Sequence, residues 1–184
     1  MEWIGRVLTS EFFWGIVIGL LLAIVVAAAT IWLDSRRRRW TVAAFCQDLV
    51  GSVCDLINNL EDNRDRNRVI DLEFIETIAV EIGVYGRNRE HLVVLADAKL
   101  RKDVREFFTR VAALLAQIRW RLGQFNEANQ RAQAETDPLR QMNHKVTATG
   151  SLNEAHQACD RLREMNGRGE ALGTRLDKFT RLWS

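Results

Sequence analysis

The longest apolar run of the chain lies near its N-terminal end. Residues 12–33 contain no charged side chain. These 22 residues, as a helix with about 1.5 Å of rise each, span roughly 33 Å, which is enough to cross a hydrocarbon core of about 30 Å. No other stretch of the sequence stays apolar over that length, so the pattern predicts one transmembrane helix over residues 12–33.

Beyond this run, apolar residues recur at spacings of three and four, the repeat of an amphipathic helix. The first such series comprises Val42, Cys46, Leu49, Val53, Leu56 and Leu60. It predicts a helix that could continue directly from the membrane span. Residues 61–68 read EDNRDRNR and contain no apolar side chain, which predicts a solvated turn or loop.

Residues 71–95 fit two patterns. Asp71 could cap a helix that ends at Gly83 or Gly86. The apolar residues within 78–84 also alternate, which fits one strand of a small hairpin. We favour the helix, because an isolated hairpin in an otherwise helical chain needs packing to be stable.

The clearest soluble element runs from about Asp97 to Ala134. Its apolar residues follow a heptad-like rhythm, and a second row widens the apolar face beyond a narrow coiled-coil seam. The first row is Leu100, Val104, Phe107, Val111, Leu114, Ile118, Phe125, Ala128 and Ala132, and the second is Phe108, Leu115 and Leu122. A face that wide suits packing against two neighbours, so residues 41–135 are expected to form an antiparallel helical bundle with one long helix.

The C-terminal part is expected to be a separate arm. Residues 136–150 are rich in polar residues and hold the single proline of the chain, so they are assigned to a linker. Ser151 and Glu154 have the spacing of a capping box, which predicts an amphipathic helical arm over 151–184. Glycines near Gly167 weaken its middle and indicate a hinge.

Small residues recur every fourth position within the predicted span. They are Gly15, Gly19, Ala23 and Ala27. This spacing places small side chains along one helix face, where a second membrane helix can approach closely. We expect this face to mediate self-association; the alternative is a lipid-facing anchor that happens to contain small residues.

Basic residues follow the span in the juxtamembrane segment 34–40. Four of them are consecutive, namely Arg36, Arg37, Arg38 and Arg39. Because positive residues are retained on the cytoplasmic side, residues 1–11 should lie outside and the large domain in the cytoplasm. The four arginines could also bind anionic lipid headgroups. A cleaved signal peptide is the rival interpretation, and the length of the apolar run argues against it.

Charge and cysteine content exclude two further classes. The chain has 26 basic and 24 acidic residues and a net charge of +2, so no strong nucleic-acid interface is expected. Three cysteines do not make a disulfide framework, and we expect them to be small apolar fillers in a reducing compartment.

Candidate chemistry is sparse. His156 and Cys159 lie three residues apart, but two ligands are too few for zinc, so no metal site, cofactor or enzymatic activity is expected. Arg119, Trp120 and Arg121 could stack on a nucleic-acid base. We favour the more common arrangement, in which the tryptophan covers the edge of a core and the arginines stay solvated.

These patterns predict an all-α protein of the inner (plasma) membrane with a single span. The layout resembles that of many small bacterial membrane proteins. We expect a membrane-anchored helical scaffold or adaptor that self-associates and recruits a protein partner at the cytoplasmic face, through the long helix or the C-terminal arm. The alternative is a signal-triggered membrane effector whose transmembrane helices cluster and perturb the bilayer.

Overall fold

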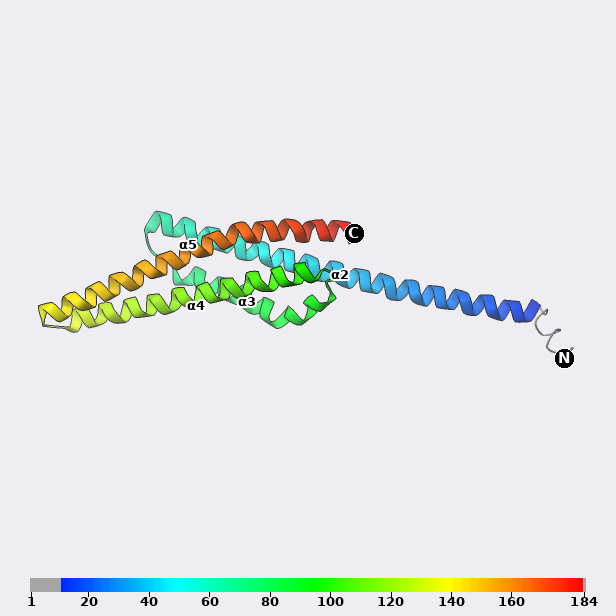
Figure 1. Cartoon of the computed structure of the whole chain (residues 1–184), viewed down its shortest axis with the longest axis horizontal. Coiled ribbons are helices and arrows are strands. Elements are labelled where there is room, and N and C mark those ends of the chain that lie inside the picture. Colours follow the sequence, from blue (N-terminus) through cyan, green and yellow to red (C-terminus); the bar gives the residue numbers. More distant parts are fainter. Residues whose placement is uncertain (1–10, 184) are drawn as a thin grey trace.

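A computed structural model describes residues 11–183. The elements, in chain order, are α2 (Glu11–Asn67), α3 (Leu72–Asn88), the 3-10 helix η1 (Arg89–Val94), α4 (Ala98–Ala134) and α5 (Pro138–Trp183). No strand occurs among the described residues, which confirms the all-α class. Figure 1 shows an elongated molecule in which one end of α2 extends far beyond the other helices.

Helix α2 is continuous from the apolar run into the folded core. The prediction of a loop over 61–68 was wrong, because the helix continues to Asn67. Glu61 and Arg64 lie on its buried face and form an ion pair, so this charged stretch is compatible with packing. The helix ends where Arg68 takes a φ of 53° and donates its backbone N–H to the Arg64 carbonyl at 2.7 Å.

Helix α3 confirms the favoured interpretation of residues 71–95, and the hairpin alternative was wrong. Asp71 caps the helix by accepting a hydrogen bond from the Glu73 N–H at 2.9 Å. The helix passes through Gly83 and Gly86, where we had expected an end, and stops at Asn88. Ile75, Ile78 and Tyr85 face the core at helical spacing, which explains why burial favours a helix here.

Helix α4 begins and ends close to the expected limits. Asp97 caps it by accepting hydrogen bonds from the N–H groups of Lys99 and Leu100. Its buried residues include both predicted apolar rows, except that Leu114 is only partly buried and Phe125 does not join the core.

Helix α5 is unbroken over 46 residues, so the predicted linker over 136–150 was wrong. The turn before it comprises only residues 135–137. Proline is tolerated in a first helical turn because its missing N–H would have no partner there. Asp137 accepts a hydrogen bond from the Leu139 N–H at 3.0 Å and takes the capping role that we had given to Ser151. The expected hinge at Gly167 was also wrong, since α5 passes through it without interruption.

The four α-helices alternate in direction (Figure 1). α5 runs antiparallel to α4, as the ion pairs Arg175–Asp103 and Arg121–Glu154 show. It also runs antiparallel to α2, and one hydrophobic core joins α2, α3, η1, α4 and α5. The arm predicted as residues 151–184 is therefore part of this core over its described length.

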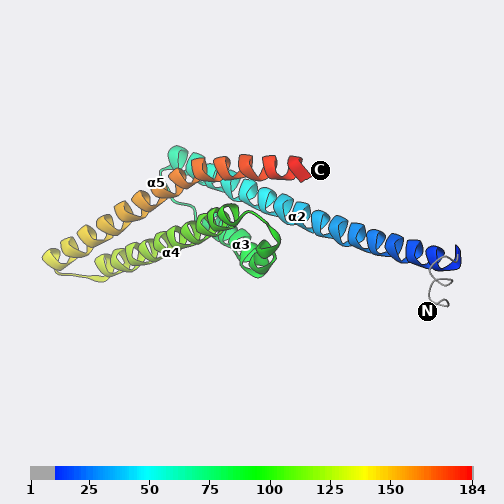
Figure 2. The same cartoon turned by 45° about the vertical axis from the view of Figure 1, so that its right-hand side comes forward.

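The α4–α5 hairpin projects past the end of α2, and both views show its turn at the opposite end of the molecule from the apolar part of α2 (Figures 1 and 2). In the projecting part, the contact between the two helices includes small buried residues, namely Ala128, Ala132 and Ala148. Gln141 adds a hydrogen bond to the Ala132 carbonyl at 3.1 Å. We call the segments 122–134 and 138–154 the hairpin tip.

Candidate functional site

The apolar part of α2 lies outside the folded core. Its large side chains between residues 18 and 33 are 55–71 % exposed. Water-soluble proteins rarely expose so large a continuous apolar surface. By length and composition, α2 is the one helix in the described part of the chain that could cross a membrane. Residues 1–10 of the predicted outer segment 1–11 fall outside the described residues.

The small-residue face is exposed along the same segment. Gly19, Ala23 and Ala27 are all exposed, and no atom outside the helix backbone lies within 4 Å of a Cβ built on Gly19. Gly15 lies in α2, but its surroundings fall outside the described part. The face is therefore open to a second helix, and self-association through it stays a prediction.

The arginine segment makes mainly local contacts. Arg38 pairs with Asp34 one turn earlier at 3.0 Å, and the Arg36 guanidinium lies 5.3 Å from the centre of the Trp32 ring. Thr41 donates its hydroxyl hydrogen to the Arg37 carbonyl at 3.0 Å. These contacts lie at the helix surface. The role of the four arginines in orienting the chain across a membrane stays a prediction.

A buried polar cluster joins the end of α2 to α5. Arg64 contacts Glu61 at 2.6 Å and Asp160 at 2.8 Å, and it donates a hydrogen bond to the His156 carbonyl at 3.2 Å. Glu61 is 5 % exposed, and neither of its carboxylate oxygens accepts an aligned hydrogen bond from the described residues. Burial raises the pKa of Glu61, although Arg64 and Arg163 oppose that shift.

The histidine and cysteines of the core have altered acidity. Burial, and then the charge of Arg64, lowers the pKa of His156. Burial raises the pKa of Cys46, Cys54 and Cys159 to about 12, so these free thiols are poor nucleophiles at neutral pH. Within residues 11–183, no group of three or more His, Cys, Asp or Glu side chains could hold a metal ion.

In the cluster at 119–121, the tryptophan is exposed and the arginines form ion pairs, which differs from the expected arrangement. Trp120 is 55 % exposed and does not cover the core, whereas its two arginine neighbours are engaged. Arg119 pairs with Glu76 of α3 at 2.5 Å, and Arg121 pairs with Glu154 of α5. The Arg121 guanidinium also lies 4.2 Å from the centre of the Trp120 ring. The arginines therefore connect α4 to its neighbours and are only partly solvated, since the Arg119 and Arg121 side chains are 37 % and 24 % exposed.

An exposed apolar row runs along α5 in the hairpin tip. Leu139, Met142 and Val146 are 75 %, 64 % and 63 % exposed, and their spacing of three and four continues to Thr149 and Asn153. We call these five residues the tip face. A shallow depression beside it is lined by Met142 and Val146, among others. Sequence reasoning missed this face because the segment was assigned to a linker; the three-and-four spacing was the signal available.

Within α5, no acidic side chain lies between the ends of the tip face, although Asp137 and Glu154 flank the segment. Residues 138–153 contain Arg140, His144 and Lys145 and no acidic residue. Arg140 lies 3.7 Å from Asp137, whereas Lys145 lines the depression. The tip face therefore consists of three exposed apolar residues continued by two polar ones at helical spacing, with a basic margin at Lys145.

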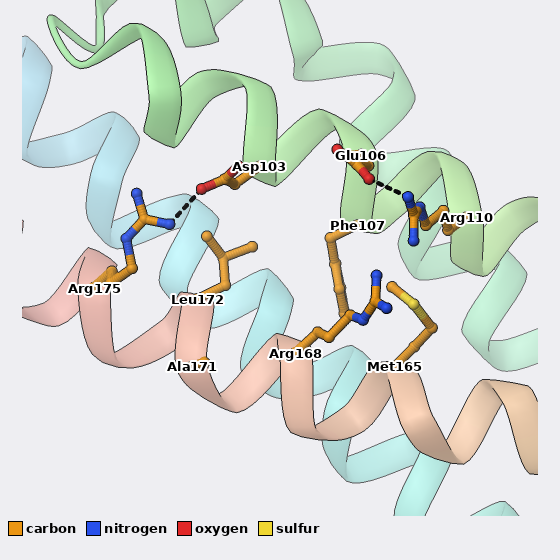
Figure 3. A pocket seen from close by; sticks show the side chains of 9 residues that line it. All are labelled: Asp103, Glu106, Phe107, Arg110, Met165, Arg168, Ala171, Leu172 and Arg175. Carbon is orange, nitrogen blue, oxygen red and sulfur yellow. Dashed lines mark hydrogen bonds and ion pairs between the residues drawn. The ribbon is translucent and has the colours of Figure 1, made fainter.

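A second unpredicted feature is a groove between α4 and α5, closer to α2 (Figure 3).

Comparisons of the chain with protein-family models, with curated proteins and with solved structures find no match.

Proposed function

We propose that the protein is a membrane-anchored helical scaffold, which self-associates through its span and recruits a helical protein partner at the cytoplasmic face of the membrane. One observation carries this proposal: α2 is a single helix whose first part is apolar and exposed, and whose later part belongs to the hydrophobic core. In lipid, the exposed part would lose its contact with water, and no loop would separate the anchor from the core.

This continuity makes the anchor a rigid support. Residues 34–67 of α2 correspond to roughly 50 Å of helix, and the projecting part of α4 adds about 20 Å. A span over residues 12–33 would thus hold the hairpin tip up to roughly 70 Å from the bilayer. The remaining helices form an antiparallel bundle in this proposal, and the positive-inside rule puts them in the cytoplasm.

The tip face supports recruitment of a helix. Apolar residues at spacings of three and four match the ridges of a partner helix, as in a coiled-coil seam. The basic margin, with Lys145 beside the depression, favours a partner whose apolar row is flanked by acidic residues. The occupant that we propose is therefore an amphipathic helix with an acidic flank from another protein.

The proposed self-association takes place between the membrane spans of two copies. Gly15, Gly19, Ala23 and Ala27 would allow two spans to approach closely. A Gly19→Leu variant should lower the cross-linked dimer fraction in native membranes, while Leu20→Ile, which adds no bulk, should not. Equal dimer fractions in all three proteins would contradict this part of the proposal.

The partner is tested with charge substitutions on the tip face. Met142 and Val146 are exposed, so Met142→Lys and Val146→Lys should leave the thermal unfolding midpoint nearly unchanged. A photo-cross-linker at Leu139 of the wild type should then label an acidic-flanked helix, and both variants should lose this product. Thr147→Lys, on a neighbouring face of the same helix, is the matched control.

Two outcomes would contradict recruitment. One is a cross-linked product that survives both lysine substitutions, and the other is a labelled segment with a basic or apolar flank.

The alternative function, an effector that perturbs the bilayer, predicts that expression collapses the membrane potential. A scaffold leaves a potential-sensitive dye unchanged.

A further inference from the structure

The groove between α4 and α5 has a volume of about 260 Å³. Its floor is apolar and comes from Phe107 of α4 and from Met165 and Leu172 of α5, which are 3 %, 5 % and 4 % exposed. Figure 3 shows side chains of both helices converging on this space. The groove therefore offers an apolar surface that a small ligand could cover.

The charges around the groove do not cancel. Its two carboxylates are both engaged, since Asp103 pairs with Arg175 and Glu106 pairs with Arg110. Arg168 is the third cation, and it forms no ion pair with any residue of the described range 11–183. Its guanidinium points toward α4 between Phe107 and Met165 (Figure 3). One positive charge therefore remains beside the apolar floor.

We propose that this groove binds a small amphipathic carboxylate. The carboxylate would pair with the Arg168 guanidinium, which matches its planar geometry, and a short apolar tail would cover Phe107 and Met165. A volume of 260 Å³ equals that of roughly nine water molecules. It suits a phenylalkyl or short alkyl chain and is too small for a phospholipid.

The ligand comes from the aqueous phase rather than from the bilayer. Gly169, next to Arg168, contacts Cys54 of α2, which is about 21 residues beyond the end of the predicted span. That separation corresponds to roughly 30 Å of helix, which exceeds the depth of a headgroup layer. This step alone rests on the proposed membrane placement; the groove and its charge do not.

The experiment uses the full chain in lipid nanodiscs and the probe 4-phenylbutyrate. Its neutral counterpart is 4-phenylbutan-1-ol, and empty nanodiscs correct for partition into lipid. By isothermal titration, the carboxylate should bind about ten times more tightly than the alcohol, since charge-assisted hydrogen bonds are the stronger kind. Arg168→Gln should reduce carboxylate binding to the level of the alcohol.

Two further variants complete the test. Arg161→Gln, at an exposed arginine of α5 outside the groove, should bind like the wild type. Ala171→Leu, at an exposed position of the lining, should fill the groove and weaken both probes about tenfold while α5 stays folded.

Equal affinity for acid and alcohol in the wild type would overturn the proposal. So would wild-type affinity in Arg168→Gln, or the absence of saturable binding of 4-phenylbutyrate. None of these outcomes bears on the span or on the tip face, so the proposed scaffold function is tested separately.

Discussion

Gly169 of α5 lies directly against both α2 and α4. A Cβ at this position would overlap the Cys54 sulfur and lie 2.9 Å from Cε2 of Phe107. The absence of a side chain therefore permits the three-helix contact. Gly167, two residues earlier, has no atom within 4 Å of a built Cβ, so the two glycines differ in role although both lie inside the same helix.

Alanine substitutions should separate these roles. Gly169→Ala should lower the free energy of unfolding by about 2 kcal/mol, because overpacking a filled core outweighs the gain in helix propensity. Gly167→Ala should raise it by about 1 kcal/mol, since alanine is the better helix former in open space. Urea unfolding in mild detergent, followed by circular dichroism, measures both. Changes of the same sign would contradict the close contact at Gly169.

Glu61 should make stability depend on pH. Burial raises its pKa in the folded state above the ordinary 4.5, so the charged form costs stability at neutral pH. The folded protein gains stability as pH falls from the raised pKa toward 4.5, and the gain is complete below 4.5, where the carboxyl is protonated in both states.

The matched variant is Glu61→Gln, which is neutral at every pH. It should be more stable than the wild type at pH 7, and the difference should shrink as the pH of the unfolding experiment approaches 4.5. Glu164→Gln, at an exposed position of α5, is the control and should follow the wild type. A stability difference that grows on acidification would contradict the raised pKa.

At the scale of elements, a buried polar contact joins α2 and α5 beside their shared apolar core. Arg64 makes this contact, since its guanidinium connects two carboxylates and a carbonyl that come from both helices. Residues 61–67 stay helical, and the buried charges of Glu61 and Arg64 have these partners. Asn58 and Asn166 add a hydrogen bond of 2.8 Å between the same helices, nearly two turns from the Arg64–Asp160 pair.

Arg64→Ala should therefore destabilise the protein by about 3 kcal/mol, because it leaves the buried Glu61 carboxylate without its cation. Adding Glu61→Gln should restore part of this loss, since the variant then buries no unpaired charge. Thermal unfolding of both variants measures the effect. A double variant no more stable than Arg64→Ala would show that Glu61 does not cause the loss.

At the scale of the whole molecule, the exposed apolar part of α2 and the hairpin tip occupy opposite ends (Figure 1). The continuous helix α2 connects the exposed apolar part to the hydrophobic core that it shares with the other helices. The groove lies between these ends, where α4 and α5 pack on α2. Anchor, groove and tip face are thus separate surfaces that can be altered one at a time.

The anchor is tested by a charge at its centre. Leu22→Arg should weaken membrane insertion by about 3 kcal/mol and move part of the protein to the soluble fraction after carbonate extraction. Thr147→Arg, an equal charge change in the hairpin tip, should leave the fractionation unchanged. Wild-type protein in the soluble fraction without detergent would contradict the membrane assignment and the proposed function with it.

The periodicity of apolar residues was sufficient to predict an all-helical chain, the exposed apolar run and the limits of α4, because helix formation and apolar spacing are local properties. The end of α2 was decided by tertiary contacts, whereas the start of α5 follows a local cap at Asp137 that the sequence analysis did not use. Polar residues in 61–68 and 136–150 resembled loops, but Arg64 pairs with Asp160 of α5 and Gln141 donates a hydrogen bond to the Ala132 carbonyl of α4. The groove at Arg168 has the same origin, since contacts between distant residues leave no local repeat in the sequence.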